Sequence, residues 1–268
     1  MPPDPEEMRA VARRAALVGG EIVGSGARPE GGGAKGLPGD WVTDVDLASE
    51  RAISAFLRSE TPRVAVQGEE LGGETTGLRW VVDPLDGTTN YLHGFWAVGV
   101  SVALVAEDLV LAGAVHSPFQ DQTWHAGRGG GTVWERPDGT VPCRVSERSP
   151  ERAIVSTGFP FRHKERIPRH LAVLEGALRA FEDLRRPGAA ALDLAWVACG
   201  VFEGFFELGL APWDVAAGGI LIEEAGGVVT DWDGGSDHLS GNILAGSPAV
   251  HERLVRLAAN GTSEGDQP

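Results

Sequence analysis

Apolar side chains recur every three or four residues in two N-terminal stretches, which is the spacing of amphipathic helices. The first stretch covers residues 5–23 and the second covers residues 46–58. Residues 24–40, between them, are rich in Gly and Pro, so a loop is predicted there.

β-Structure is predicted next, because short apolar runs replace the helical spacing. Strands are expected at residues 64–66 and 79–83, and the second of them ends in a turn that contains Pro and Gly. Residues 98–116 contain two β-rich runs joined near Glu107, and residues 122–135 indicate a hairpin around a Gly-rich turn.

Past Pro150 the two kinds of element alternate. Strands are expected at residues 153–157, 202–208, 228–230 and 242–247. Helices are expected at residues 164–182, 193–200, 215–227 and from about residue 248 onward.

Helices and strands are mixed in both halves of the chain, which predicts a layered α/β (α+β) fold. Loop-forming residues at 137–150 suggest a boundary between an N-terminal subdomain, residues 1–145, and a C-terminal subdomain, residues 146–260. Residues 261–268 are expected to be a disordered tail.

Composition agrees with a globular protein. The chain has 268 residues, 42% of them hydrophobic and 23% charged. It has no run of eighteen apolar residues, and its first residues do not resemble a signal peptide, so no membrane partner is expected. Only Cys143 and Cys199 are present, which argues against a disulfide framework and favours the cytoplasm.

The net charge of −15 predicts that nucleic acid is not a partner, because a phosphate backbone is itself anionic. The same charge means that an anionic ligand would need positive charge from a source other than Lys and Arg. Bound divalent cations are the obvious source.

Asp83 and Asp86 are the first candidates for such chemistry. They lie at the end of a predicted buried strand, on either side of Pro84-Leu85. Two neighbouring carboxylates repel each other unless a cation lies between them, and hard oxygen ligands favour Mg²⁺, Mn²⁺ or Ca²⁺. The alternative is a simple Asp-Gly turn in which Asp86 bonds its own backbone.

Three other segments carry candidate residues. Free amides at Gly87-Thr88-Thr89 can hold a phosphate, although N-capping by Thr explains the same pattern. Glu69 and Glu70 follow a predicted strand, and a Glu there can complete a metal shell. Asp214 is predicted as a helix N-cap that can also bind a metal.

Asp46 lies just inside the helix predicted from residue 46, and capping by Thr43 or Asp44 leaves it available for another role. Other signals are weaker. The Gly-rich stretch at residues 127–131 precedes a strand and not a helix, so it is not a dinucleotide loop. The histidines show no zinc-binding HExxH spacing.

Taken together, these segments resemble the inositol monophosphatase family, within the lithium-sensitive, metal-dependent phosphomonoesterase superfamily. The matching pieces occur in the family's order and are DWVTDVD at 40–46, GEE at 68–70, WVVDPLDGTTNYLHGF at 80–95 and WDVAAGGILIEEAGG at 213–227. The resemblance implies a layered αβαβα sandwich of the inositol monophosphatase and fructose-1,6-bisphosphatase type.

The resemblance also implies metal ligands. Glu69, Asp83 and the Leu85 carbonyl would bind a first Mg²⁺ ion, and Asp83, Asp86 and Asp214 would bind a second. Glu69 would also touch a third, weaker site. Two or three Mg²⁺ ions are therefore implied, with Mn²⁺ as a substitute and Li⁺ as an inhibitor.

Catalytic roles follow from the same resemblance. Asp46 would hydrogen-bond Thr88, and Thr88 with Glu69 would orient the attacking water. The backbone amides of Gly87 and Thr88 would hold the phosphate.

On the substrate side, the resemblance implies that Glu207 contacts substrate hydroxyls and that Asp86 and Asp214 also border the substrate. Glu70 would support the third metal site from behind its ligands. Lys35 matches a basic residue on a mobile metal-site segment of the family.

One departure concerns the residues before the helix predicted at 193–200. Gly188-Ala189-Ala190 stands where the family often has Gly-Ser or Gly-Thr. Ala189 offers no hydroxyl near the leaving group, so only backbone contacts at Gly188 and Ala190 are expected there. The choice of substrate is correspondingly open.

These roles imply Mg-dependent hydrolysis of a small polyol phosphate, preferably inositol 1-phosphate, by direct attack of water. Histidinol phosphate and fructose 1,6-bisphosphate stay open as alternative substrates. A non-enzymatic alternative is a regulatory or RNA-polymerase-binding member of the family, although no metal ligand is lost here. A homodimer is expected, because relatives are commonly homodimers.

Overall fold

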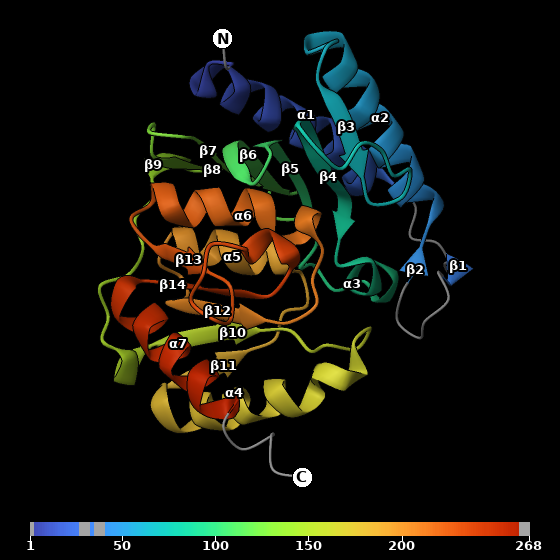
Figure 1. Cartoon of the computed structure of the whole chain (residues 1–268). Coiled ribbons are helices and arrows are strands. Elements are labelled where there is room, and N and C mark those ends of the chain that lie inside the picture. The colour runs from blue at the N-terminus through green and yellow to red at the C-terminus, as the bar shows by residue number, and fades with distance from the viewer. Residues whose placement is uncertain (1–2, 27–32, 35–40, 263–268) are drawn as a thin grey trace.

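Two β-sheets alternate with three pairs of helices in five layers (Figure 1). The computed structural model describes residues 3–26, 33–34 and 41–262. The helices of this part of the chain are α1 (Pro5–Ser25), α2 (Asp44–Glu60), α3 (Thr88–His93), α4 (Ile167–Ala180), α5 (Ala190–Ala198), α6 (Pro212–Glu224) and α7 (Pro248–Thr262).

The larger sheet has the strand order β3-β4-β5-β6-β7-β8-β9. Its strands are β3 (Ala65–Gly68), β4 (Leu78–Asp86), β5 (Gly99–Ala106), β6 (Leu109–Ser117), β7 (Gln122–Gly127), β8 (Thr132–Arg136) and β9 (Gly139–Pro142). Neighbours from β4 to β9 are antiparallel, and β3 runs parallel to β4. Short turns explain the antiparallel pairs from β5 to β9, since consecutive strands joined by hairpins must reverse direction, whereas β4 and β5 are joined through α3.

The smaller sheet has the order β11-β10-β12-β14-β13 and mixes parallel and antiparallel pairs. Its strands are β10 (Ile154–Thr157), β11 (Asp183–Arg185), β12 (Gly204–Glu207), β13 (Val228–Thr230) and β14 (Ile243–Gly246). The remaining short elements are the strands β1 (Gly33–Ala34) and β2 (Trp41–Val42) and the 3₁₀ turns Pro150–Arg152, Lys164–Arg166 and His238–Ser240.

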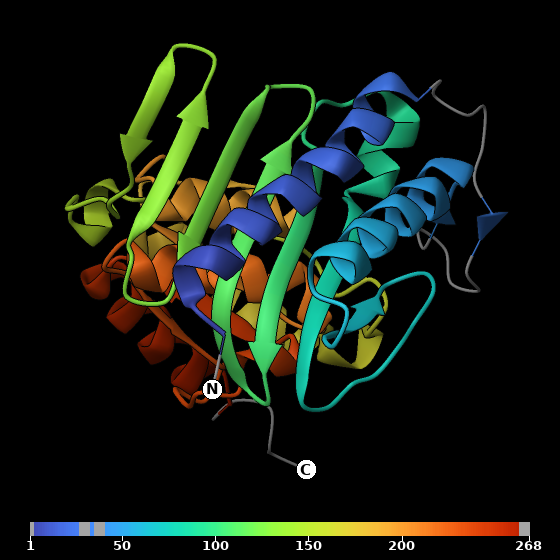
Figure 2. The same cartoon turned by 90° about the horizontal axis from the view of Figure 1, so that it is seen from above.

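Helices α1 and α2 cover the outer face of the larger sheet (Figure 2). The face of α1 that meets the sheet is rich in small residues, including Ala12, Ala15 and Ala16, which are fully buried. Small side chains let the helix approach the strands closely. Thr43 caps α2, and its backbone N–H donates to Asp46 in return, so the start of this helix is fixed.

Helices α5 and α6 form the middle layer between the two sheets (Figure 1). Every residue of α5 is buried, and so is most of α6. A helix that is apolar all round must be covered on both sides, which the two sheets accomplish. Helices α4 and α7 pack together on the far face of the smaller sheet.

The predicted fold class is confirmed, and most predicted elements lie within a few residues of the observed ones. Strands β1, β2, β9 and β11 were not predicted, and β1 lies within the loop predicted at residues 24–40. Helix α4 ends at Ala180, before the predicted end at residue 182, because β11 begins at Asp183. Helix α7 continues to Thr262, so the start of the tail at residue 261 is corrected, and residues 263–268 lie outside the described part.

The two sheets divide the chain between Pro142 and Ile154. That division agrees with the expected boundary, but α6 packs on β5 and β6 of the larger sheet, so two separate subdomains stay a prediction. Lys35 and Asp40 lie outside the described residues. No described helix is long and apolar enough to cross a membrane.

Candidate active site

A β-bulge in β4 turns Asp83 and Asp86 toward one another. Side chains three residues apart in a regular strand would point to opposite faces of the sheet. The pairing of β4 with β5 shifts between these two residues, and one extra residue on β4 restores a common side. Pro84, which has no N–H to donate, lies in the bulge, and the Ser49 hydroxyl of α2 donates to its carbonyl at 2.9 Å.

Asp214 reaches the same place from α6. The helix begins at Pro212 with Ala211 as its N-cap, so Asp214 is the third helical residue and not the N-cap that the sequence predicts. The Ala211 N–H donates to the Asp214 carboxylate at 2.7 Å. The Ser101 hydroxyl of β5 donates to the Trp213 carbonyl at 2.9 Å, which ties the start of α6 to the larger sheet.

The result is a cluster of three buried carboxyl groups. Oxygen atoms of Asp83, Asp86 and Asp214 all lie within 4.8 Å of one another. Each group accepts a backbone N–H, from Leu85 at 3.0 Å, Ala191 at 2.7 Å and Ala211 at 2.7 Å respectively. These bonds fix the orientation of each carboxylate.

Burial and mutual repulsion make the charged forms of this cluster unfavourable. Burial raises the pKa of Asp86 to about 8, and the charge of Asp214 adds to the effect. Burial and the charge of Glu69 raise the pKa of Asp214 to about 6. The pKa of Asp83 is raised well above its ordinary value by burial, then by the charges of Glu69 and Asp86.

These residues fit a hard divalent cation. The donors are carboxylate oxygens, with the Leu85 carbonyl beside them in the pocket lining, and they lie close enough for one ion to contact all three carboxylates. Oxygen-only ligands suit Mg²⁺, whereas zinc prefers nitrogen and sulfur. A cation would also remove the repulsion that raises the three pKa values.

Glu69 lines the same pocket but is not one of the three clustered groups. It follows β3, and the segment that carries it is held by the buried Glu50 of α2. Glu50 accepts the backbone N–H groups of Glu70 at 2.7 Å and Leu71 at 2.9 Å. Helix α2 therefore supports two parts of the site. Ser49 holds the bulge in β4, and Glu50 holds the segment that carries Glu69.

Thr88 and Asp46 are joined by a hydrogen bond, with the Thr88 hydroxyl 3.1 Å from the Asp46 carboxylate and 3.2 Å from the Leu85 carbonyl. Asp46 is fully buried and also belongs to the cap of α2, so one carboxylate links two segments. Burial raises its pKa, and hydrogen bonds from Thr43 and Thr88 oppose that shift.

Gly87 is the N-cap of α3, and simple capping by a Thr side chain is not observed there. Its φ of 89° lies in the left-handed region that favours glycine. A Cβ at this position would also lie 2.9 Å from the Ala97 carbonyl oxygen. The sharp turn brings the backbone of Gly87 and Thr88 to the pocket wall.

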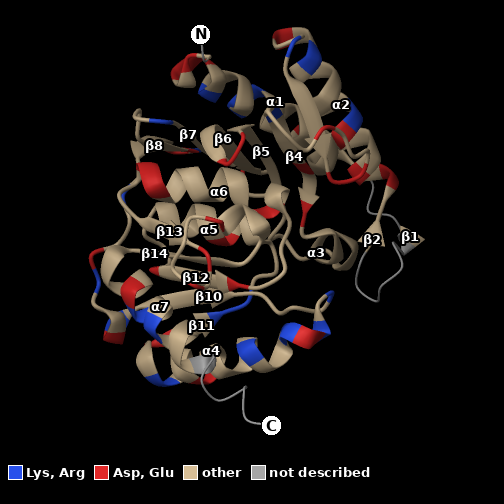
Figure 3. Cartoon of the chain, viewed as in Figure 1, with Lys and Arg blue, Asp and Glu red and all other residues tan. Residues whose placement is uncertain are grey.

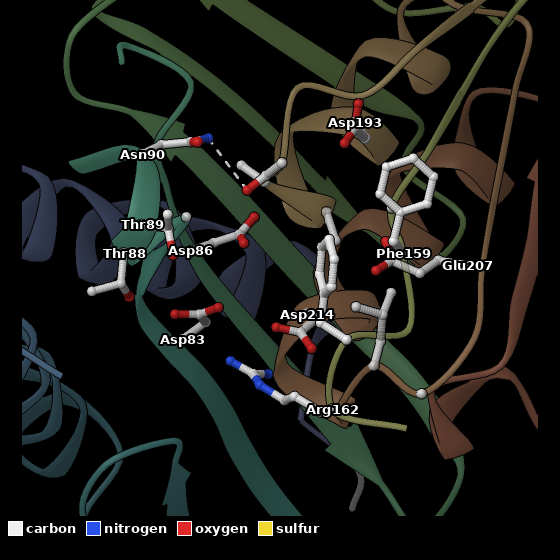
Figure 4. A pocket seen from close by; sticks show the side chains of 18 of the residues that line it. Asp83, Asp86, Thr88, Thr89, Asn90, Phe159, Arg162, Asp193, Glu207 and Asp214 are labelled. Carbon is white, nitrogen blue, oxygen red and sulfur yellow. Dashed lines mark hydrogen bonds between the residues drawn. The ribbon is translucent and has the colours of Figure 1, made fainter. Parts of the chain in front are cut away.

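One pocket of about 640 Å³ is lined by the three clustered carboxylates, Glu69 and the Gly87-Thr88 turn (Figure 4), whereas Asp46, Ser49 and Glu50 are not part of its lining. Its described lining includes two arginines, Arg162 and Arg186, and a larger set of carboxyl groups: Glu69, Asp83, Asp86, Asp193, Glu207 and Asp214. Figure 3 shows acidic positions around the middle of the molecule, while Lys and Arg positions gather around α4. The acidic lining makes bound cations a requirement for any anionic ligand.

Glu207, at the end of β12, lies on the other side of the pocket from Thr88 (Figure 4). Its carboxylate lies against Gly158, where an added Cβ would be 2.1 Å from a Glu207 oxygen, so a larger residue there would require the Glu207 side chain to move. Burial raises the pKa of Glu207 to about 8; the Asp214 charge adds to this, and Arg186 and Arg162 oppose it.

The departure at Ala189 has a structural counterpart. Ala189 is the N-cap of α5 and offers no side-chain hydrogen bond to the helix. The carboxylate of Asp86, on β4, takes the place of a capping side chain, because it accepts the Ala191 N–H at the start of α5. Gly188 and Ala190 line the pocket on either side of it.

Several residues around the site had no role in the sequence analysis. Asn90 donates to the carbonyls of Ala97 at 2.7 Å and Pro187 at 2.9 Å, and so joins α3 to the segment before α5. Asn90 belongs to the DGTTN motif, so the motif could have identified it as a residue of the site. Ser49, Glu50 and Asp193 carry no comparable local signal, because only the fold brings them to the site.

Comparison with known proteins agrees with this arrangement. The pattern of the inositol monophosphatase family matches residues 4–263. The chain is 39% identical over 223 residues to an inositol-1-monophosphatase of Mesorhizobium japonicum, covering 82% of this chain and 83% of that protein. It is 38% identical over 220 residues to the Nus factor SuhB of Escherichia coli K12, covering 81% of each.

A solved structure, that of the extragenic suppressor protein suhB from Bartonella henselae, superimposes with a TM-score of 0.86 at 36% identity. It covers 95% of this chain and 99% of that one. The fold and the acidic pocket are those of a metal-dependent phosphatase family. The chain belongs to the inositol monophosphatase family.

One expectation is corrected by these relatives. The net charge of −15 predicts no nucleic-acid partner, but several relatives are named Nus factor SuhB. The exclusion is therefore wrong, because net charge describes the average over the whole surface and not any one face of it. The homodimer stays a prediction.

Proposed function

We propose that this protein is a Mg²⁺-dependent phosphatase that hydrolyses a small polyol phosphate monoester, with inositol 1-phosphate as the preferred candidate. The observation that carries the proposal is the cluster of Asp83, Asp86 and Asp214, with oxygens within 4.8 Å, beside the Gly87-Thr88 turn. Membership in a family of metal-dependent phosphatases supports it.

In this proposal Asp83, Asp86 and Asp214 hold the metal ions, with Glu69 and the Leu85 carbonyl completing the set. Divalent cations, when bound, neutralise a phosphate dianion, lower the pKa of water and stabilise a leaving alkoxide. The amides of Gly87 and Thr88 contribute hydrogen bonds to the phosphate oxygens.

Thr88 and Glu69 would orient the attacking water. The Thr88 hydroxyl donates its proton toward Asp46 at 3.1 Å, which leaves its oxygen lone pairs to accept a hydrogen bond from water. Glu69 would accept the other proton. The described lining of the pocket has no Cys, Ser or His nucleophile, which favours direct attack by water over a covalent phosphoenzyme.

The leaving alcohol would lie near Glu207, Gly188 and Ala190, on the side of the pocket away from Thr88. Glu207 would accept a hydrogen bond from a substrate hydroxyl. We also propose that the protein acts in the cytoplasm, which agrees with its two free cysteines.

A second candidate function comes from the relatives named Nus factor SuhB. In that case the chain would act by binding RNA polymerase, whether or not it also hydrolyses a phosphate ester. Co-purification of RNA polymerase with the tagged protein from its own cells would support this role, and a metal-ligand variant would show whether it needs the catalytic site.

A substrate panel tests the preferred function. Phosphate release would be measured from inositol 1-phosphate, histidinol phosphate and fructose 1,6-bisphosphate, each with Mg²⁺, Mn²⁺ or EDTA, and then with added Li⁺. The proposal predicts Mg²⁺-dependent release that is fastest from inositol 1-phosphate. Rapid hydrolysis of histidinol phosphate beside negligible turnover of inositol phosphates would overturn the substrate preference.

A further inference from the structure

Asp193 is a buried carboxyl group that lines the pocket and has no part in the proposed metal site. It lies in the first turn of α5, and its backbone N–H donates to the Ala189 carbonyl at 3.0 Å. Its residue is only 2% exposed. Its Oδ1 atom has no hydrogen-bond partner among the described residues.

A buried polar atom without a partner is unfavourable, typically by about 1–3 kcal/mol. The Ser156 hydroxyl lies close enough to favour the ionised form of Asp193, but it does not reach hydrogen-bond geometry with Oδ1. Apart from Ser156, no described side chain donates to this oxygen. A donor that arrives with the ligand would satisfy this oxygen, because Asp193 borders the pocket.

Asp193 and Glu207 are acidic residues of the pocket that are not members of the three-carboxylate cluster, although the charge of Asp214 acts on Glu207 and that of Asp86 acts on both. Apart from burial, the charge of Glu207 is the largest influence that raises the pKa of Asp193. In Figure 4 both carboxyl groups lie on the opposite side of the pocket from Thr88, with Phe159 nearby. That side is where the proposed reaction puts the leaving alcohol.

Two arginines offset part of the negative charge of these two carboxyl groups. The charge of Arg186 lowers the pKa of both Asp193 and Glu207, and the charge of Arg162 lowers that of Glu207. The Arg186 guanidinium lies over the rings of Phe159 and Phe161, 5.6 Å from each centroid, and is held at the pocket mouth. A ligand ammonium would meet two arginines there, whereas hydroxyl groups would not be repelled.

We propose that Asp193 is a specificity-determining residue that, together with Glu207, binds hydroxyl groups of the leaving polyol. This inference rests on the proposed phosphatase function and deepens it. It assigns the preference for a polyol to a pair of carboxyl groups from α5 and β12, on the far side of the pocket from the bulge in β4.

The test compares three phosphate monoesters in saturating Mg²⁺: inositol 1-phosphate, phenyl phosphate and phosphoethanolamine. The wild type would be compared with Asp193→Asn, which keeps the shape of the side chain, and with Asp193→Ser and Asp193→Ala. Asp183→Asn, an exposed carboxylate on β11, serves as the matched control. Circular dichroism and melting temperature would establish folding.

The expected result for Asp193→Ala is a fall of about tenfold or more in the ratio of kcat/KM for inositol 1-phosphate to kcat/KM for phenyl phosphate, as for the loss of one hydrogen bond. The fall should be smaller for Asp193→Asn, whose amide oxygen can still accept a hydrogen bond. Most of the change should be in KM, and Asp183→Asn should leave the ratio where it was. Equal loss on all three esters would overturn the inference, because a structural role predicts it. An unchanged ratio would do so as well.

Two other outcomes also count against the inference. A loss confined to phosphoethanolamine would mean that the pair binds a cation and not hydroxyls. Failure of all three Asp193 variants to fold would make the residue structural. If the wild type hydrolysed none of the esters with Mg²⁺, the proposed phosphatase function would itself fail, which separates that failure from a failure of Asp193 alone.

Discussion

At the scale of single residues, individual carboxylates of the site each contact two different segments of the chain. Asp86 belongs to the metal cluster and also accepts the N–H of Ala191 at the start of α5. Asp46 caps α2 and holds the Thr88 hydroxyl. Because each group joins two segments, the site is assembled by the same contacts that order the ends of its helices.

The Thr88 hydroxyl provides a test of the proposed water-orienting pair. Thr88→Val keeps the branched shape but removes the oxygen that contacts Asp46 and Leu85, so kcat should fall about 10²-fold or more. Thr88→Ser restores the hydroxyl and should recover most of the activity. Steady-state phosphate release measures both, and full activity of the Val variant would exclude a role for the hydroxyl.

Motifs reveal some of these residues and not others. Asp83, Asp86 and Thr88 are adjacent in one motif, so the sequence identifies them together. Asp193 lies inside an apolar helix, and its significance depends on burial, a missing partner and the distant Glu207. Such properties arise only when segments distant in sequence meet.

At the scale of elements, the bulge in β4 and the support from α2 position the site. The short apolar run at residues 79–83 correctly predicts β4 but not its bulge, because a bulge is defined by pairing with β5. Helix α2 was predicted as an amphipathic helix over residues 46–58, with one apolar face. Its buried Ser49 and Glu50, which hold the bulge and the Glu69 segment, were not distinguished from other polar residues.

Glu50 tests that support directly. Glu50→Ala leaves the N–H groups of Glu70 and Leu71 without an acceptor, which should lower the free energy of unfolding by about 2–3 kcal/mol. Mg²⁺ affinity should fall about 10- to 100-fold, as for loss of a group that orients a ligand. Urea unfolding and Mg²⁺ titration measure the two effects.

Arg51→Ala is the matched control for Glu50, because it changes the next residue of α2 at an exposed position. Arg51→Ala should change neither the free energy of unfolding nor the Mg²⁺ affinity appreciably. An Mg²⁺ affinity of Glu50→Ala equal to that of the control would mean that α2 does not position Glu69.

At the scale of the whole molecule, the alternation of helical and strand patterns along the chain predicts a layered α/β fold, and the resemblance to the inositol monophosphatase family implies the αβαβα order of the layers. The order of strands within each sheet, including β9 and β11 at the edges, depends on pairing that short polar strands do not specify. Net charge was the least reliable guide, since it excluded nucleic acid from a family in which relatives are named Nus factors.

The buried carboxyl groups predict an unusual dependence of stability on pH. In the metal-free protein, burial raises the pKa values of Asp86 and Glu207 to about 8 and that of Asp214 to about 6. Each group then binds its proton more tightly when folded than when unfolded. Its contribution to stability is complete below the ordinary carboxyl pKa and is lost as the pH rises through the folded value.

We therefore expect the melting temperature in EDTA to fall as the pH rises from about 5 to about 8, by ~2–4 °C for each kcal/mol lost. Mg²⁺ should displace these protons, so the stabilisation that it provides should grow over the same range. Differential scanning calorimetry with Mg²⁺ or EDTA measures both trends. A melting temperature in EDTA that rises toward pH 8 would contradict the assigned pKa directions.

The most direct test of the central claim is the rate of phosphate release from inositol 1-phosphate with Mg²⁺, for the wild type and for Asp86→Asn. Asn keeps an oxygen that can accept the Ala191 N–H, so the fold should survive while the metal cluster loses a charged ligand. The account predicts Mg²⁺-dependent release by the wild type and a loss far beyond about 100-fold in the variant. Equal rates in two folded proteins, or release that does not need Mg²⁺, would contradict it.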